Sequence, residues 1–213
     1  MEKIMTLKDH VYEYIADQIR LGDLKPEVKI NENQICEKLG ISRTPVREAL
    51  IQLAAEGVLE NNARRGFVVR KTDVNTVMEL YEIIGILEGL AAKKSCPLMT
   101  GKDYKDMQFY IDTIDLAIKS GNFEMYHAQQ YRLHQMFIGK CGNAALLECI
   151  DRYKRKLLKQ TYVDDPEGKT KDILYKTNDE HRVILQLFID KKADELLRYL
   201  SEVHWREDVA EFD

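Results

Sequence analysis

The apolar positions in the N-terminal part of the chain recur at helical spacing and predict three short helices. In the first helix an apolar residue occupies every fourth position, and these residues are Leu7, Val11, Ile15 and Ile19. Glycine readily adopts the left-handed conformation that stops a helix, so we expect the first helix to end at Gly22 and the second at Gly40. Asn31 can cap the second helix, and the third begins near Ser42 or Thr44.

The third helix is followed by a segment with a different periodicity. The apolar stripe of this helix follows the spacing i, i+3, i+4 and i+7 and consists of Val46, Ala49, Leu50 and Leu53. After Gly57, the sequence "VLENNARRGFVV" contains two short β-rich runs separated by Asn, Ala, Arg and Gly, which predicts a β-hairpin. Three helices followed by a two-stranded wing are the layout of a winged helix-turn-helix.

From Thr72 onward the pattern is helical almost without interruption. The expected helices cover residues 73–95, 101–119, 123–141, 144–160, 170–189 and 192–208. We therefore predict a mainly α protein with two domains. Residues 1–71 form a winged helix-turn-helix with a small β-wing, and residues 72–213 form an all-α helical bundle.

Composition limits the class of protein. The chain has 213 residues, of which 45% are hydrophobic, so it can bury a sizeable core. It has no apolar run long enough to span a membrane and no apolar signal-peptide core, so we expect a cytoplasmic protein without a membrane partner. Four cysteines lie far apart, without CxxC spacing, which favours reduced, mostly buried thiols over a zinc knuckle or a disulfide framework.

Positive charge is concentrated before residue 72. Residues 1–71 carry 12 Lys+Arg against 11 Asp+Glu, whereas residues 72–213 carry 20 against 25. Within residues 42–71 there are six basic side chains and three acidic ones. A local basic surface on a chain of net charge -4 suits a phosphate-rich partner such as DNA. A solvated face without a partner is the alternative.

The start of the third helix holds the candidates for base contacts. A guanidinium group can bond the O6 and N7 atoms of guanine at once, so Arg43 and Arg47 are candidates for reading bases. Thr44 has a short side chain that suits a phosphate or a thymine methyl group, or it only caps the helix. The N-terminus of this helix also offers free N–H groups to phosphate.

The tip of the wing holds the second group of candidates. Arg64 and Arg65 precede Gly66, where the missing side chain lets the backbone approach DNA. The alternatives are an ordinary exposed hairpin and a winged-helix module that binds only proteins. A protein-binding module would not need arginines at both the helix start and the wing.

The N-terminal sequence resembles the DNA-binding domain of the GntR family of bacterial transcription regulators. The resemblance covers residues 7–70 and is carried above all by the core "SRTPVREAL" and the wing "RRGFVV". It implies binding to double-stranded operator DNA. The chain departs from the family at Glu27, where glycine is usual, and at Asn33, where some members have an arginine that contacts DNA. The second change implies a different affinity or operator.

The helical part resembles the FCD effector domain of the FadR-like branch of this family. The stretches that carry the resemblance are "LYEIIGILEGLAAKKS", "YRLHQMFIGKCGNAALLECI" and "NDEHRVILQLFIDKKADELLRYLSEVHW". It implies that residues 72–213 bind a small-molecule effector and dimerise. The whole chain would then be a ligand-responsive transcriptional regulator, a homodimeric repressor that its effector releases from the operator.

Many FCD domains hold a divalent metal of the Zn or Ni type through one aspartate and three histidines. The histidines that correspond to these ligands are His134, His181 and His204. The aspartate position is Gln130, whose amide oxygen is a weaker ligand, and His127 is a possible substitute one helical repeat before His134. The spacing from His181 to His204 is about one residue longer than in the family pattern.

A second departure concerns the effector. The family's arginine, which helps to hold a small carboxylate, is replaced by Ile84. A neutral or differently charged effector is therefore as compatible with the sequence as a small carboxylate is. A metal-dependent enzyme built on the three histidines is the remaining alternative. The sequence contains no HExxH helix, GxSxG elbow or glycine-rich phosphate loop to support it.

Overall fold

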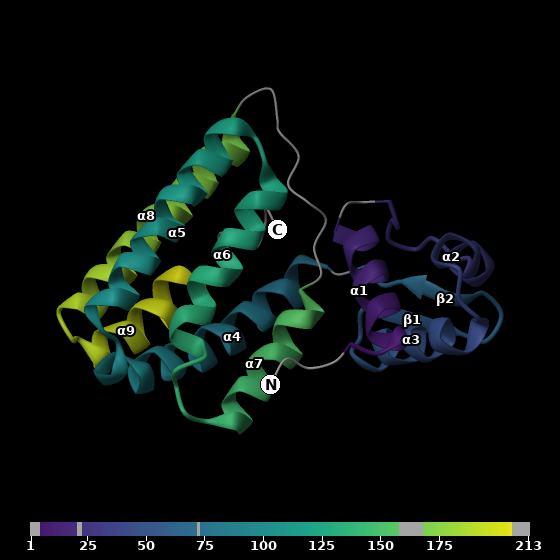
Figure 1. The fold of residues 1–213 in the computed structure, drawn as a ribbon, viewed down its shortest axis with the longest axis horizontal. Helices are drawn as coiled ribbons and strands as arrows, with labels where there is room; N and C mark the ends of the chain where they lie inside the picture. Colours follow the sequence, from purple (N-terminus) through teal and green to yellow (C-terminus); the bar gives the residue numbers. More distant parts are fainter. Residues whose placement is uncertain (1–4, 21–22, 72, 158–167, 206–213) are drawn as a thin grey trace. The chain divides into compact units, whose positions relative to one another are not determined.

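The computed structural model describes residues 5–20, 23–71, 73–157 and 168–205, and the chain forms two compact units (Figure 1). The first unit contains Met1–Asp73 and Lys154–Thr161, and the second contains Val74–Tyr153 and Tyr162–Asp213. Each unit has a hydrophobic core of its own. In the described residues no helix combines the length and the apolar character needed to cross a lipid bilayer.

The first unit has the element order of a winged helix-turn-helix. Its elements are α1 (Leu7–Arg20), α2 (Glu32–Leu39), α3 (Arg43–Ala55), β1 (Leu59–Asn62) and β2 (Gly66–Val69). Asn31 caps α2, because its side-chain oxygen accepts hydrogen bonds from the backbone N–H groups of Asn33 and Gln34, at 3.1 and 3.3 Å. Gly40 follows α2 with a φ of 65°. The predicted end of α1 at Gly22 lies outside the described residues.

The apolar stripe of α3 lies at the centre of the first core. All four residues of the stripe are fully buried, namely Val46, Ala49, Leu50 and Leu53. The helix packs against α1, α2 and β1 through this stripe. The predicted stripe is therefore confirmed, and the opposite side of α3 is left facing solvent.

The wing is a two-stranded antiparallel sheet. Leu59 lies opposite Val69, and Asn62 lies opposite Gly66, which leaves residues 63–65 as the connecting turn. Gly66 has a φ of 77°, which glycine adopts without strain. The segment before α2 joins the other side of β2, since Lys29 forms a β-bridge with Val68. This bridge brings the start of α2 next to the wing.

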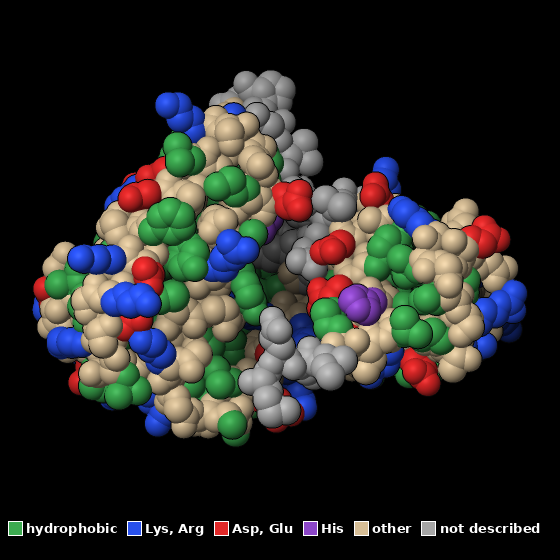
Figure 2. All heavy atoms as spheres, in the orientation of Figure 1, with side chains coloured by type: hydrophobic (Ala, Val, Ile, Leu, Met, Phe, Trp, Pro, Cys, Tyr) green, Lys and Arg blue, Asp and Glu red, His purple; other side chains and the backbone are tan. Residues whose placement is uncertain are grey.

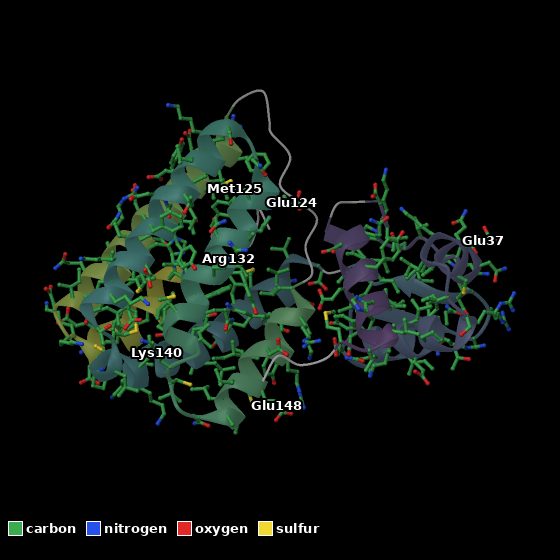
Figure 3. The ribbon with its side chains drawn as sticks, in the orientation of Figure 1. Glu37, Glu124, Met125, Arg132, Lys140 and Glu148 are labelled. Atoms are coloured by element: carbon green, nitrogen blue, oxygen red, sulfur yellow. The ribbon has the colours of Figure 1, made fainter. Side chains whose placement is uncertain are left out.

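The second unit is a helical bundle, and the structure confirms the mainly α fold class. Its elements are α4 (Val74–Ser95), the 3-10 helix η1 (Cys96–Leu98), α5 (Gly101–Ser120), α6 (Phe123–Ile138), α7 (Ala144–Lys156), α8 (Lys169–Ile189), α9 (Ala193–Tyr199) and η2 (Leu200–His204). The part of α7 from Lys154 onward is assigned to the first unit. α5 packs on α6 and α8, and α4 packs on α9 and η2 (Figure 1). Glu124 and Arg132 project from the exposed side of α6 (Figure 3).

Three predicted helix limits differ from the structure by several residues. The helix predicted for residues 123–141 ends at Ile138, because the chain turns at residues 139–141. The helix predicted for residues 192–208 is α-helical only to Tyr199 and continues as the π-helix η2. Its residues 206–208 lie outside the described part of the chain. The helix predicted for residues 144–160 ends at Lys156, and residues 158–160 are not described.

Two glycines let the C-terminal helical segment approach α4 closely. A Cβ atom at Gly85 would lie 3.1 Å from the Cα of Ser201, and one at Gly89 would lie 2.7 Å from the carbonyl oxygen of Leu197. These contacts involve backbone atoms, which cannot rotate away. The two small residues therefore set the depth at which α9 and η2 pack.

The cysteines are all free thiols, as their spacing predicted. Cys96 and Cys141 are buried, Cys36 is half-buried and Cys149 is exposed, so burial is less complete than predicted. Burial raises the pKa of the Cys96 thiol, which keeps this group protonated and unreactive.

Candidate functional site

The exposed side of α3 presents the predicted base-reading residues together. Arg43, Thr44 and Arg47 are all exposed within its first turns. Ser42 occupies the N-cap position, so Thr44 lies inside the helix and its side chain is not the cap. Thr44 is thus left on the solvent side beside the two arginines.

A groove of about 530 Å³ lies between the start of α2 and α3. Its walls include Lys29, Asn31, Asn33, Arg43 and Arg47. The sequence had identified the arginines and Asn33 but had missed Lys29. That lysine reaches the groove through its bridge to β2, a long-range pairing that helical periodicity cannot reveal. Three basic side chains on one concave wall suit a polyanion such as the DNA backbone.

The tip of the wing carries Arg64 and Arg65, both exposed. The Arg65 guanidinium donates a hydrogen bond to the carbonyl oxygen of Glu27, at 3.2 Å, so it is partly held against its own unit. Glu27 has a φ of 63°, the left-handed conformation that glycine favours. This explains why glycine is usual at that position in the resembling sequences. Gly66 is half-buried at the base of the tip.

The three predicted histidines converge in the core of the second unit. His134 comes from α6, His181 from α8 and His204 from η2, and they are 1%, 1% and 5% exposed. The Nε2 atom of His134 lies 3.2 Å from that of His181 and 3.3 Å from that of His204. Among the described residues they form the one group of three or more His, Cys, Asp or Glu side chains that could hold a metal ion.

The outer ring nitrogen of each histidine has an oxygen partner. The Glu88 carboxylate accepts a hydrogen bond from Nδ1 of His134 at 2.7 Å. The Glu180 carboxylate accepts one from Nδ1 of His204 at 3.0 Å. The Nδ1 atom of His181 lies 3.1 Å from the side-chain oxygen of Asn178. Because Nδ1 is the donor in each case, the Nε2 lone pairs all point to the centre of the cluster.

The amide of Asn178 is oriented by its own partners. Its NH₂ group donates to the backbone oxygen of Ile111 at 3.0 Å and to the Asp115 carboxylate at 2.7 Å. The amide oxygen is therefore the atom that faces His181. Asp115 also forms an ion pair with Arg182, which fixes the carboxylate in turn. The sequence had not identified Asn178 or Glu180, because both act through the histidines rather than on a ligand.

The geometry of the cluster fits a metal ion. The ligand atoms of the three histidines lie within 4.8 Å of one another, and two of the Nε2 pairs are much closer. Lone pairs held this close repel one another unless a positive charge lies between them. Zinc–nitrogen distances of about 2.0–2.1 Å in a tetrahedron place neighbouring nitrogens about 3.3 Å apart. The two separations in this chain, 3.2 and 3.3 Å, agree with that value. Three imidazoles, each backed by an oxygen acceptor, are also the arrangement that metal sites use to fix the tautomer.

The other residues discussed from the sequence lie around the cluster without joining it. Gln130 is half-buried one turn before His134, and within the described residues its amide makes no hydrogen bond to the histidines. His127 contacts the ring of Tyr126 and is not in the cluster. Ile84 is fully buried one turn before Glu88, so an apolar group lies where the family has its arginine.

The π-helix explains how His204 reaches the cluster. A π-turn holds one residue more than an α-turn, and such turns are frequent at functional sites. The η2 segment ends at His204, so its wider turn sets the direction in which this side chain points. The next residue, Trp205, donates from its indole N–H to Glu88 at 2.9 Å and packs edge-on against Tyr81.

Residues 7–69 match the family model of bacterial regulatory proteins, gntR family, and residues 79–205 match that of the FCD domain. The chain belongs to the GntR family. Within that family, it carries an FCD domain. As a GntR-family protein it has a DNA-binding unit and an effector-domain unit, which confirms the resemblance found in its sequence.

Comparison with individual proteins agrees with this assignment. The chain is 27% identical to the Nta operon transcriptional regulator of Aminobacter aminovorans over 83% of this chain and 80% of that protein. It is 28% identical to a probable D-xylose utilization operon transcriptional repressor of Paenarthrobacter nicotinovorans, over 67% of this chain and 62% of that protein. The solved structure of E. coli McbR/YncC has a TM-score of 0.78 at 20% identity, covers 98% of both chains and shares the fold.

Proposed function

We propose that this GntR-family protein represses transcription by binding operator DNA as a homodimer and releases the operator when a small molecule binds its helical unit. The observation that carries the proposal is the basic groove of the first unit, where Arg43 and Arg47 lie exposed with Lys29. Repression is supported by the name of one relative, a probable transcriptional repressor. A protein that binds chromosomal operators acts in the cytoplasm.

Within this proposal, Arg43 and Arg47 bond base edges in the major groove, and Thr44 contacts a phosphate or a thymine methyl group. The wing residues Arg64 and Arg65, with the backbone at Gly66, contact the DNA beside this major groove. Two half-sites related by twofold symmetry would be bound by the two α3 helices of a homodimer. Effector binding lowers affinity only if it favours a dimer geometry that does not fit this spacing.

The effector site is proposed to hold a divalent metal of the Zn or Ni type. Its ligands would be His134, His181 and His204. Gln130, at the position of the family's aspartate, would be a weaker fourth ligand. The ion supplies a Lewis-acid centre to which an effector oxygen or nitrogen can bind. Because Ile84 is buried where an arginine would pair with a carboxylate, we propose an effector that is not held as a small carboxylate.

The alternative is a metal-dependent enzyme that uses the same three histidines. No specific arrangement in the described residues favours it, and the relatives of the chain are named as transcriptional regulators. We therefore infer that the chain is not an enzyme.

DNA recognition is tested with duplexes selected from a random library by the wild-type protein. Arg47→Ala should weaken retardation of the selected duplex about 5- to 150-fold, as expected for a lost pair worth ~1–3 kcal/mol, and relax the preference for one base. Arg152→Ala, which removes an exposed arginine from α7, is the matched control and should bind as the wild type does. Equal binding by both variants would contradict the assigned docking of α3.

Metal binding is tested by elemental mass spectrometry on untagged protein purified without chelators. We expect close to one transition-metal ion per chain in the wild type and in His127→Ala, and its loss in His134→Ala. His127 is the matched control because it lies on α6 outside the cluster. Circular dichroism checks that each variant is folded. Metal-free protein in all three samples would mean that the histidines are a polar core instead.

A further inference from the structure

The outward face of α4 carries an apolar stripe. Ile83, Ile86 and Leu90 are 37%, 53% and 39% exposed, and their spacing of three and four residues places them on one side of the helix. The other side of α4 is already buried, with Ile84 and Glu88 fully enclosed. A helix whose second face is also apolar calls for a partner on that face.

Charged side chains of opposite sign lie at the two ends of the stripe. Glu79 and Glu82 precede it and Lys93 follows it, and all three are exposed. Glu79, Ile86 and Lys93 are spaced by seven residues, so they lie on almost the same line along the helix. Lys93 pairs with Asp194 at 2.6 Å but keeps 43% of its side chain exposed. Lys94 adds a second exposed positive charge at this end.

The spacing makes this face complementary to itself. Glu79 and Lys93 each lie seven residues from Ile86, which is about 10.5 Å along the helix axis in opposite directions. We propose that two copies of this chain pair through α4, antiparallel about a twofold axis at Ile86. In that arrangement Glu79 of each copy lies opposite Lys93 of the other, which gives two equivalent charge pairs. Ile83 of one copy lies opposite Leu90 of the other.

Other pairings of the same surface are disfavoured by charge. Parallel α4 helices would place Glu79 against Glu79 and Lys93 against Lys93, and like charges in contact are repulsive. A twofold contact requires a patch that complements itself, which the sign change along α4 provides. A partner of a different kind would have to reproduce the same order of charges. A second copy of the chain supplies that order without further assumption.

A second exposed apolar face, on α5, lacks this property. Phe109 and Leu116 are 62% and 61% exposed, and Figure 2 shows apolar side chains among charged ones over this helix. The exposed charges at the two ends of the α5 face are Lys102 and Lys119, which have the same sign. These two lysines do not give the α5 face the change of charge sign that α4 has. The contrast favours α4 and gives a control surface on the same unit.

This inference rests on the proposed homodimeric regulator and locates the contact that holds its two copies together. The mass in solution of the full-length wild type, measured by light scattering during gel filtration, should be that of two chains. Ile86→Asp places two carboxylates on the twofold axis and should halve the mass. Leu116→Asp makes the same change on α5 and should leave it unchanged. A monomeric wild type, or a dimeric Ile86→Asp variant, overturns the proposal.

The charges are tested by exchanging them. Glu79→Lys/Glu82→Lys and Lys93→Glu/Lys94→Glu should each be mostly monomeric and should form a mixed dimer when combined. Circular dichroism establishes that both variants are folded. Failure of the folded variants to associate would overturn the antiparallel register. No DNA is present, so these results do not depend on Arg47, whose replacement by alanine should weaken DNA binding in a protein that remains dimeric.

Discussion

Gly89 offers a direct test of the close packing that positions the histidine cluster. It lies in the interior of α4, where Gly→Ala ordinarily stabilises a helix by about 0.5–1 kcal/mol. In this chain the added methyl group would lie 2.7 Å from the carbonyl oxygen of Leu197 and 3.2 Å from its Cα. Ordinary contacts of a Cβ atom lie at 3.4–4 Å, so α9 would have to move away by several tenths of an ångström.

The two effects oppose each other, and their sizes decide the sign. Overpacking of a core costs about 1–3 kcal/mol, and the upper part of that range applies where the obstacle is backbone that cannot change rotamer. Subtracting the gain in helix propensity leaves a net loss of about 1–2 kcal/mol for Gly89→Ala. His204 follows Leu197 by two turns, so the same displacement should separate its Nε2 from that of His134, now at 3.3 Å.

Two measurements check this prediction. Urea unfolding gives the free energy of unfolding, and competition with a chromophoric chelator gives the affinity for Zn²⁺, which we expect to fall at least tenfold. Gly101→Ala is the matched control, because a Cβ atom there meets nothing within 4 Å, and it should be as stable as the wild type or slightly more so. If Gly89→Ala gained stability as Gly101→Ala does, the close approach of α9 to α4 would be refuted.

Three further changes have defined outcomes. Glu88→Gln keeps a hydrogen-bond acceptor for His134 but removes the negative charge. It should weaken Zn²⁺ binding about 10- to 100-fold, measured by chelator competition. Unchanged affinity would show that the Glu88 charge does not support His134 as a ligand. A hydrogen bond from Lys140 lowers the pKa of Asp103 to about 2. The ionised carboxylate therefore adds about 2 kcal/mol to the free energy of unfolding at pH values above its unfolded pKa near 4. This contribution disappears as the pH falls towards 2. Asp103→Asn should therefore destabilise the protein to urea at pH 7 and progressively less below pH 4; a loss independent of pH would exclude this linkage. Glu27→Gly should raise the melting temperature, because a side chain at a φ of 63° costs about 1 kcal/mol, and a lower value would show that the Glu27 side chain stabilises the turn.

The sequence was sufficient for the DNA-binding unit because its signals there are local. The cap at Asn31, the glycine at residue 40 and the stripe that begins at Val46 each act within one or two helical turns, and all three appear where periodicity placed them. Lys29 was missed for the opposite reason. Its place in the groove depends on a bridge to Val68, a residue far along the chain, and no spacing rule contains that contact.

The candidate metal cluster was predicted only through resemblance, and the physical reason is its construction from three separate helices. No spacing rule links His134, His181 and His204, since tertiary packing alone decides whether their rings meet. The oxygen partners were harder still to foresee. Glu180 lies next to His181 in the sequence, yet it bonds His204 instead, because neighbouring residues on a helix point in different directions.

The π-helix η2 shows how the width of a helical turn sets the direction of a residue of the cluster. Each residue of a regular α-helix adds about 100° of rotation, so an α-helical turn in place of η2 would point the His204 side chain in a different direction. In the wider π-turn His204 faces His134, and the following Trp205 reaches Glu88. The Glu88 oxygen that accepts from Trp205 also accepts from His134. The π-turn thus brings both His204 and Trp205 to the candidate metal site, and the Glu88 carboxylate connects Trp205 to the histidine cluster.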